Sequence, residues 1–336
     1  MTQNAAGDLR PPEAWRLKPV YGSQTLLAVL ACFAFLVWSA PRVELNVFVR
    51  NVQEFVAASL GSGSDSSQIG RGLASIEDKM FPLVMDERTP LEAGSEPRAW
   101  PSRIEEVTRH ETALNPETLE IETRDITERY LVQPFGYLLY VCGKMLQSIE
   151  MAIWASLFAM LASLCLMPLA ARNFTPHPMV RTAARSLVSL LRTIPELVSA
   201  LFLVLLFGFG PVAGILALTL HSVGFLGKFY ADDVETADIR PQEALAALGA
   251  SRLTVLRLAV LPNVVPSFVA LTLYVVDRNI RMATVIGIVG AGGIGQELKG
   301  RFDMLQYGHV GTILLVIFAT VLALDAFASQ VRRRLI

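Results

Sequence analysis

The chain contains the stretch Glu243-Ala244-Leu245-Ala246-Ala247-Leu248-Gly249, followed after nine residues by Ala259-Val260-Leu261-Pro262. The Ala/Leu run predicts a short helix that begins near Glu243, where a carboxylate suits the positive end of the helix dipole. Gly249 allows the chain to turn without strain at Cβ. Ser251 is expected to cap a second short helix. Two short helices hinged at a glycine are therefore predicted.

The second of these helices is expected to be amphipathic. Leu253, Leu256 and Val260 are spaced three to four residues apart, which places them on one helical face. Arg252 and Arg257 lie on the other sides. The pattern indicates an apolar stripe that a partner can cover, and an ordinary loop helix is the alternative.

The composition indicates an integral membrane protein. Of the 336 residues, 53% are hydrophobic and 18% are charged, and the apolar residues are gathered in blocks long enough to cross a bilayer. We expect an all-α protein with six transmembrane helices. The predicted spans are residues 20–41, 151–171, 186–208, 211–227, 258–276 and 304–324.

Basic residues between the blocks predict the orientation. They fall on one side of the membrane if both termini are cytoplasmic, as the positive-inside rule requires. These residues are Arg10, Arg16 and Lys18, then Arg172, Arg181 and Arg185, and finally Arg332, Arg333 and Arg334. Residues 1–19 are then a cytoplasmic N-terminus, and residues 231–261, which hold the helix pair, are cytoplasmic as well. A cleaved signal peptide is the alternative for the first block, but its apolar run is long for one.

Residues 42–135 are expected to lie outside the cytoplasm. They carry 17 acidic against 10 basic residues and are punctuated by Gly, Ser and Pro, so we expect partial order and little core. Residues 76–85 and 126–140 are predicted to lean on the membrane domain, residues 136–336. The acidic balance argues against a nucleic-acid partner.

Residues 277–300 combine charges with a glycine run. Asp277, Arg278 and Arg281 lie between two apolar runs, where charges should face protein or water. The run Gly290-Ala291-Gly292-Gly293-Ile294-Gly295 fits a dinucleotide-binding pattern, but residues 304–324 contain no acidic residue to complete it. A broken helix beside a permeation path fits better, with free N–H groups that can meet an anion.

Three further interpretations concern polar groups inside the apolar blocks. Pro195 is expected to kink the third block as a hinge, with Glu196 paired to Arg192 across one turn. Asp277 and Arg281 form either an internal ion pair or part of an anion path. His221 lies either on that path or in a packed, helix-bridging position.

The pair of short helices resembles the cytoplasmic coupling loop of binding-protein-dependent ABC importer permeases, although Leu245 and Ala259 depart from its pattern. Further pieces look like the phosphonate-importer permeases. They are Arg192-Thr193-Ile194-Pro195-Glu196-Leu197-Val198, Leu273-Tyr274, Asn279-x-Arg281-x-x-Thr284-Val285 and the glycine run. Methionine permeases share the coupling loop and the glycine run. The resemblance spans about residue 140 to the C-terminus and implies the type I importer permease fold.

The resemblance implies a permease subunit that imports a phosphonate, phosphite or phosphate. Methionine or another small solute is the alternative cargo, and a stand-alone secondary transporter is a further alternative. The implied contacts with the ATPase are Glu243, Ala244, Gly249, Leu253, Leu256, Leu261 and Pro262. The implied substrate path is Arg278, Asn279, Arg281, Thr284, Gly290, Gly292, Gly293 and His221.

The implied partners follow from what the chain lacks. It contains no phosphate-binding loop of the Gly-x-x-x-x-Gly-Lys-Ser/Thr type, so two separate subunits must bind ATP and Mg²⁺. A second permease copy and an extracytoplasmic binding protein complete the implied complex, and residues 42–135 are either a rim that meets that binding protein or a linker. Three cysteines and four scattered histidines argue against a disulfide framework, a metal site, a cofactor or an enzymatic activity.

Overall fold

The computed structural model describes residues 23–61, 68–90, 102–114 and 121–335. The chain divides into two compact units, Met1–Asp78 and Lys79–Ile336, and each is described by itself. The predicted cytoplasmic N-terminus, residues 1–19, lies outside the described residues.

The first unit is helical. It holds α1 (Ser23–Ser39), α2 (Leu45–Gly61) and most of α3 (Gln68–Met80). Helix α1 matches the predicted first span and has 17 residues. At 1.5 Å per residue it is about 26 Å long, slightly less than the roughly 30 Å of a bilayer's hydrocarbon core. The start of the predicted span, residues 20–22, lies outside the described residues.

The second unit contains a small antiparallel sheet, so the all-α prediction is wrong here. Strand β3 (Ile121–Gln133) lies between β1 (Glu87–Pro90) and β2 (Arg103–Leu114), in the order β1-β3-β2. Residue Arg103 pairs with Val132 and Leu114 with Ile121, so the two long strands pair along their whole length. Their backbone groups pair with one another, while their sequences are rich in charged residues, which is why composition alone did not indicate strands.

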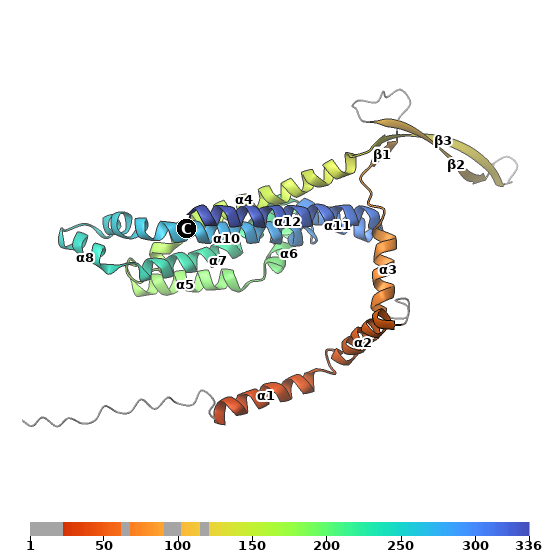
Figure 1. Cartoon of the computed structure of the whole chain (residues 1–336). Helices are drawn as coiled ribbons and strands as arrows, with labels where there is room; N and C mark the ends of the chain where they lie inside the picture. Colours follow the sequence, from red (N-terminus) through yellow and green to blue (C-terminus); the bar gives the residue numbers. More distant parts are fainter. Residues whose placement is uncertain (1–22, 62–67, 91–101, 115–120, 336) are drawn as a thin grey trace, which may run out of the picture. The chain divides into compact units, whose positions relative to one another are not determined.

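The rest of the second unit is a bundle of long helices (Figure 1). Its members are α4 (Gly136–Ala170), α5 (Pro178–Thr193), α6 (Glu196–Phe207), α7 (Pro211–Thr236), α10 (Leu261–Gly287), α11 (Gly293–Asp303) and α12 (Tyr307–Leu335). The sheet adjoins the start of α4, while α8 (Ile239–Ala247) lies at the opposite end of the bundle.

Small residues bring the helices of the bundle close together. Helices α4 and α7 meet through fully buried alanines, among them Ala155 and Ala217. A Cβ on Gly224 of α7 would lie 2.9 Å from the carbonyl oxygen of Val188 in α5. Close backbone approach of this kind stabilises helix packing in a membrane, where lipid is as apolar as the side chains.

Five of the six predicted spans have a counterpart in the second unit. Among the residues that the structure describes, four helices are long and apolar enough to cross a membrane: α4, α7, Arg252–Gly287 and α12, the last over Tyr307–Ala326. The third predicted block is not one straight span, because α5 and α6 meet at a 90° bend. Helix α4 begins 15 residues before the predicted residue 151, since Lys144 and Glu150 interrupt the apolar run without breaking the helix.

Residues on either side of the sheet rest on the bundle. Thr312 Oγ1 of α12 donates a 2.6 Å hydrogen bond to the carbonyl oxygen of Val84, and Leu138 N of α4 donates to that of Met85 at 3.3 Å. Val132 and Tyr137 are each only 3% exposed. The predicted contact with the membrane domain is thus confirmed for residues 80–85.

Candidate functional site

The coupling segment, residues 231–261, forms the predicted pair of short helices with one difference. The carboxylate of Asp238 accepts a 3.0 Å hydrogen bond from Arg240 N and so caps α8. Helix α8 therefore starts at Ile239, and Glu243 lies in its middle rather than at its N-terminal end, where it was predicted. The sequence analysis overlooked Asp238, although aspartate is a favoured cap.

The turn at Gly249 is built as the sequence predicts. Gly249 has φ +79° and its N–H donates to the carbonyl oxygen of Ala246, while Ala250 N donates to that of Leu245 at 3.1 Å. This pattern is a Schellman motif, which needs a residue with positive φ at the glycine position. Ser251 Oγ then accepts from Thr254 N at 3.3 Å, which confirms the predicted cap.

The predicted apolar stripe is split between two environments. Leu253 in α9 (Arg252–Val255) is 74% exposed, whereas Leu256 is 7% and Val260 0% exposed. The reason is the π-helical turn η2 (Leu256–Val260), which runs directly into α10 and directs these two side chains into the bundle. The stripe prediction is therefore wrong for Leu256 and Val260. The exposed apolar residues are Leu253 and, before the turn, Leu248 at 84%.

Of the remaining predicted coupling residues, Glu243 lines a shallow hollow of 230 Å³. Ala244 and Pro262 are exposed, and Leu261 is half-buried. The hollow joins the α4–α5 connection to α8 and α9. It is lined by Asn173, Phe174, Gln242, Glu243, Ala246, Ala250, Arg252 and Val255.

Ion pairs clamp α5 to the adjacent end of α7. Arg185 contacts Asp232 and Glu235, each at 3.0 Å, and Arg181 contacts Glu235 at 3.2 Å. Glu235 also accepts a 2.6 Å hydrogen bond from Arg172 N. From the sequence, Arg181 and Arg185 were used only to predict which side of the membrane their segment faces. Their acidic partners Asp232 and Glu235, at the end of an apolar helix, could have indicated the ion pairs.

A three-residue ionic cluster joins the bend between α5 and α6 to two other helices. Glu196 contacts Arg278 of α10 and lies 3.3 Å from Nε2 of His221 in α7. The three side chains are 14%, 21% and 14% exposed. The helix-bridging interpretation of His221 is confirmed. Glu196 bonds across the bundle to Arg278 rather than to the predicted Arg192.

The next turn of α10 carries a more accessible cation. Arg281 pairs with Asp277 at 2.7 Å, as the internal ion-pair interpretation predicts, and its side chain is 45% exposed. Thr284 Oγ1 donates to the carbonyl oxygen of Arg281 at 2.6 Å. The Arg281 side chain is thus about twice as exposed as that of Arg278, which is 21% exposed.

Asn279 lies in a buried cluster of hydrogen-bonded polar side chains, not on an open surface. Its Nδ2 donates to Ser156 Oγ at 2.9 Å and Ser222 Oγ at 3.0 Å, and its Oδ1 accepts from Ser222 at 3.2 Å. All three residues are at most 2% exposed. The amide is fully engaged within the bundle, so it ties α4, α7 and α10 together rather than lining a path.

The glycine run forms the predicted break between α10 and α11. Gly290, Gly292 and Gly293 have φ values of +91°, +88° and +70°. All are buried, and a Cβ on Gly292 would lie 2.9 Å from Pro211 N. Ile294 N donates to Ser148 Oγ at 2.9 Å, so this N–H is used inside the protein. The glycines allow the neighbouring segments to pack closely. The prediction of free N–H groups that meet an anion is wrong at Ile294, because its N–H is bonded to Ser148.

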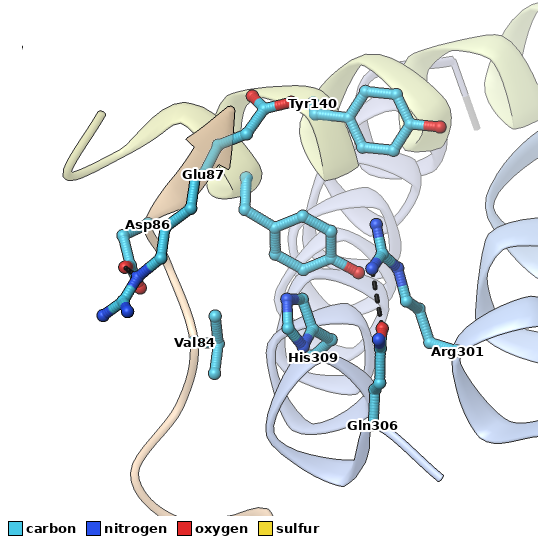
Figure 2. A pocket seen from close by; sticks show the side chains of 9 residues that line it. Val84, Asp86, Glu87, Tyr140, Arg301, Gln306 and His309 are labelled. Carbon is cyan, nitrogen blue, oxygen red and sulfur yellow. Dashed lines mark hydrogen bonds and ion pairs between the residues drawn. The ribbon is translucent and has the colours of Figure 1, made fainter. Parts of the chain in front are cut away.

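A cavity of 620 Å³, the outer cavity, lies where the residues before β1 cross α4, α11 and α12 (Figure 2). The sequence does not reveal this cavity, because its lining residues come from segments as far apart as Val84 and His309. It is lined by Val84, Asp86, Glu87, Arg88, Tyr137, Tyr140, Arg301, Gln306 and His309. In the described part of the chain, no three His, Cys, Asp or Glu residues are grouped to hold a metal ion.

The chain has close relatives among transport proteins. It is 51% identical over 235 residues to the putative phosphite transport system permease protein HtxE of Stutzerimonas stutzeri, covering 70% of this chain and 90% of that one. It is 45% identical to the phosphite transport system permease protein PtxC of the same organism, over 56% of this chain and 69% of that one. The phosphate-import permease protein PhnE of Mycolicibacterium smegmatis is 40% identical over 56% of this chain and 36% of its own length.

Solved structures share the fold. An inward-facing structure of the MetNI methionine ABC transporter matches with a TM-score of 0.52 and 19% identity, over 61% of this chain and 99% of that one. The family described as "Binding-protein-dependent transport system inner membrane component" matches residues 167–336. This match and the identity to HtxE confirm the family predicted from the coupling segment: the chain belongs to the binding-protein-dependent inner membrane permeases.

Proposed function

We propose that this chain is the membrane permease subunit of an ATP-driven importer for a phosphorus oxyanion, namely a phosphonate, phosphite or phosphate. The main support is the similarity to the putative phosphite permease HtxE: the two chains are 51% identical, and the match covers 90% of HtxE. Two further relatives, named for phosphite and phosphate transport, support the same class of cargo. The likeness to the methionine transporter, at 19% identity, speaks only for the fold.

ATP hydrolysis belongs to separate subunits in this proposal. Two ATP-binding subunits press against the coupling segments of two permease copies, most simply a homodimer. The exposed Leu248 and Leu253 offer these subunits an apolar contact, and the hollow beside Glu243 offers them a concave surface. The clamp of Arg185 on Asp232 and Glu235 makes this end of the bundle rigid, so movement of the ATPase is passed to α5 and α7.

The cargo route runs beside α10. Arg281 is the residue that meets the anion, because its guanidinium is nearly half exposed and only one carboxylate holds it. Arg278 is held by Glu196, which also contacts His221, at the bend between α5 and α6. We assign this cluster, with Arg192 and Pro195 beside it, to the hinge that moves when the path changes sides. Asn279 and the three glycines hold the adjoining helices in place.

The orientation follows from the same scheme. The coupling segment faces the cytoplasm, where ATP is available, and the sheet end of the bundle faces the outside, where a binding protein delivers the anion. Both termini are then cytoplasmic, in line with the arginines on that side.

Reconstitution tests the proposal. The full chain is assembled in lipid nanodiscs with its ATP-binding subunits, and the binding protein is loaded in turn with phosphite, methylphosphonate, phosphate or methionine. We expect at least one phosphorus ligand to stimulate ATP hydrolysis severalfold and to be taken up in liposomes. Stimulation by methionine alone, or uptake without any ATP-binding subunit, contradicts the proposal.

A further inference from the structure

Helix α2 is tied directly to the end of α1, the first membrane span. Leu45 N donates a 3.0 Å hydrogen bond to the carbonyl oxygen of Ala40. Glu44, which has φ +53°, donates from its N–H to the carbonyl oxygen of Pro41 at 3.3 Å. These are the hydrogen bonds of a Schellman motif, which closes a helix and redirects the chain. Because no free linker separates the two helices, α2 starts where the span ends.

Two side chains mark that point as the level of the membrane surface. The guanidinium of Arg42 lies over the ring of Trp38, 3.7 Å from its centroid. Tryptophan is enriched where a span meets the headgroups, and an arginine at the end of a span extends into the same polar layer. The start of α2 is therefore held at the interface between lipid and water.

Helix α2 is amphipathic, and its apolar stripe is exposed. Five apolar residues recur every three or four positions and so share one face, while most polar residues of the helix lie on the other side. The stripe consists of Leu45, Phe48, Val49, Val52 and Phe55. Phe48 is 63% exposed and Leu45 47%, so the described residues do not cover this stripe.

Helix α3 repeats the pattern and is anchored at its other end. Its stripe consists of Ile69, Leu73, Ile76 and Met80, and Leu73 and Ile76 are 53% and 54% exposed. The last residue of α3 lies against α12, because a Cβ on Gly311 would be 3.1 Å from the carbonyl oxygen of Met80. Helix α3 therefore ends beside the first turns of a second membrane span.

Neither helix carries a net charge. Helix α2 has one basic and one acidic residue, Arg50 and Glu54, and α3 has two of each kind. A surface helix that binds anionic lipid by electrostatic attraction needs a basic polar face, which neither helix has. The apolar stripes are the feature by which these helices can bind a surface.

We propose that α2 and α3 lie on the outer surface of the bilayer, with their apolar stripes inserted among the lipid headgroups. The start of α2 and the end of α3 are both held at the ends of membrane spans, which sets both helices at the depth where amphipathic helices bind. Zwitterionic lipid is sufficient for this contact. The inference rests on the orientation given with the proposed function, which places the end of α1 and the start of α12 outside.

Spin labels test this placement. The full chain, with its three native cysteines replaced by alanine, is assembled with its ATP-binding subunits in nanodiscs of a zwitterionic lipid. A nitroxide is attached at Phe48→Cys or Leu73→Cys on the stripes, and at Ala57→Cys or Ala74→Cys on the opposite, exposed faces. The measurement compares collisions of each label with oxygen, which concentrates in lipid, and with a nickel chelate, which stays in water.

We expect the ratio of oxygen to nickel collisions to be about fivefold higher on the stripes than on the opposite faces, because only the stripes enter lipid. Equal ratios on both faces would place the helices in water. Stripe labels that are shielded from both reagents would show that protein, such as a second permease copy, covers the stripes. Nanodiscs of anionic lipid should give ratios within about twofold of these. Either of the first two results, or a requirement for anionic lipid, overturns the proposal.

A matched pair of variants tests whether the stripe holds α2 in lipid. With the label at Val52→Cys, Phe48→Asp should lower the collision ratio about fivefold, since a charge is expelled from an apolar layer. Asn46→Asp adds the same charge on the polar side and should change the ratio less than about twofold. ATP hydrolysis should be equal in both variants, because neither residue belongs to the coupling segment. A ratio that Phe48→Asp leaves unchanged contradicts insertion of the stripe.

A separate arm tests the side of the membrane. A thiol reagent that does not cross membranes is added to right-side-out vesicles that contain Ala57→Cys. Labelling from outside supports the proposal, and labelling only after the vesicles are opened contradicts both the outer location and the proposed orientation. Failure of every phosphorus ligand to stimulate ATP hydrolysis is a different result, because it contradicts the proposed cargo and leaves the collision ratios as they are.

Discussion

Two glycine turns, each between two helices, differ in what surrounds them. The coupling turn at Gly249 has φ +79°, and a Cβ there would meet nothing within 4 Å. The break at Gly290–Gly293 has equally positive φ values, but each of its three glycines would clash with a neighbour. Gly249 is therefore needed only for its backbone conformation. The glycines of the break are needed for their conformation and for their missing side chains.

A glycine turn between two helices thus serves two different purposes in this molecule. At the coupling turn, the flanking Leu248 and Leu253 stay exposed, so the turn presents a surface. At the break, residues 290–295 are buried, and the turn locks α11 against α4 and the α6–α7 connection. Substitutions at the two turns should consequently separate loss of coupling from loss of fold.

Gly292→Ala should give the largest effect. Gly292 has φ +88° and ψ −174°, a conformation that is essentially restricted to glycine, and its missing Cβ faces backbone atoms of Pro211. Strain of about 1–3 kcal/mol and overpacking of about 1–3 kcal/mol add up to a severe loss of stability. Thermal unfolding in detergent and the yield of folded protein measure it.

The matched control for that variant is Gly300→Ala in α11. A Cβ on Gly300 meets nothing within 4 Å, and the residue is helical. Alanine there should be neutral or stabilise by up to about 1 kcal/mol. Equal stability of the two variants would show that the break is not locked by packing.

Sequence reasoning succeeded where function depends on neighbouring residues. The turn at Gly249 and the cap at Ser251 are local patterns, and the apolar blocks that predict the long helices are local as well. The bend at Pro195 is another such case, because proline restricts its own φ and the residue before it.

Prediction from the sequence failed where residues that are distant in the chain contact one another in the structure. Glu196 bonds to Arg278, 82 positions away, and the outer cavity draws its walls from β1, α4, α11 and α12. The sheet was missed because β2 and β3 carry many charged residues, which are depleted in strands. The burial of Leu256 depends on one π-helical turn, which helical periodicity cannot predict.

Two leucines of the coupling segment, three positions apart, should respond differently to truncation. Leu256→Ala should destabilise the fold by about 2–4 kcal/mol, since this side chain is buried. Leu253→Ala should leave stability within about 0.5 kcal/mol, because its side chain is exposed. Thermal unfolding of both variants in the same detergent checks this.

The functional outcome for Leu253 should be the reverse of its structural one. Leu253→Asp should leave the permease folded in the membrane but lower ATP-driven uptake about tenfold, since a charge enters an apolar contact with the ATPase. Uptake in liposomes and co-purification of the ATP-binding subunits measure it. Normal uptake with normal subunit binding would remove Leu253 from the coupling surface.

Arg281→Gln tests the bundle side without disturbing its packing. Arg281 is 45% exposed, so the loss of its ion pair with Asp277 should cost less than about 1 kcal/mol of stability. Uptake should fall about tenfold, because the anion loses a charged hydrogen-bond donor. Asp277→Asn breaks the same ion pair but keeps the arginine. Similar uptake in the two variants would assign the effect to the ion pair instead.

Gly249→Ala should give the smallest effect on uptake. With free space around Cβ, only backbone strain of about 1–2 kcal/mol opposes it. Gly249→Asn should recover most of that loss, since asparagine tolerates positive φ. Because the strain is relieved by unwinding the turn, alanine should also reduce uptake more than asparagine does, at equal amounts of protein in the membrane. If both variants lose uptake equally, the side chain itself obstructs the ATPase, and Gly249 then resembles the glycines of the break in needing open space.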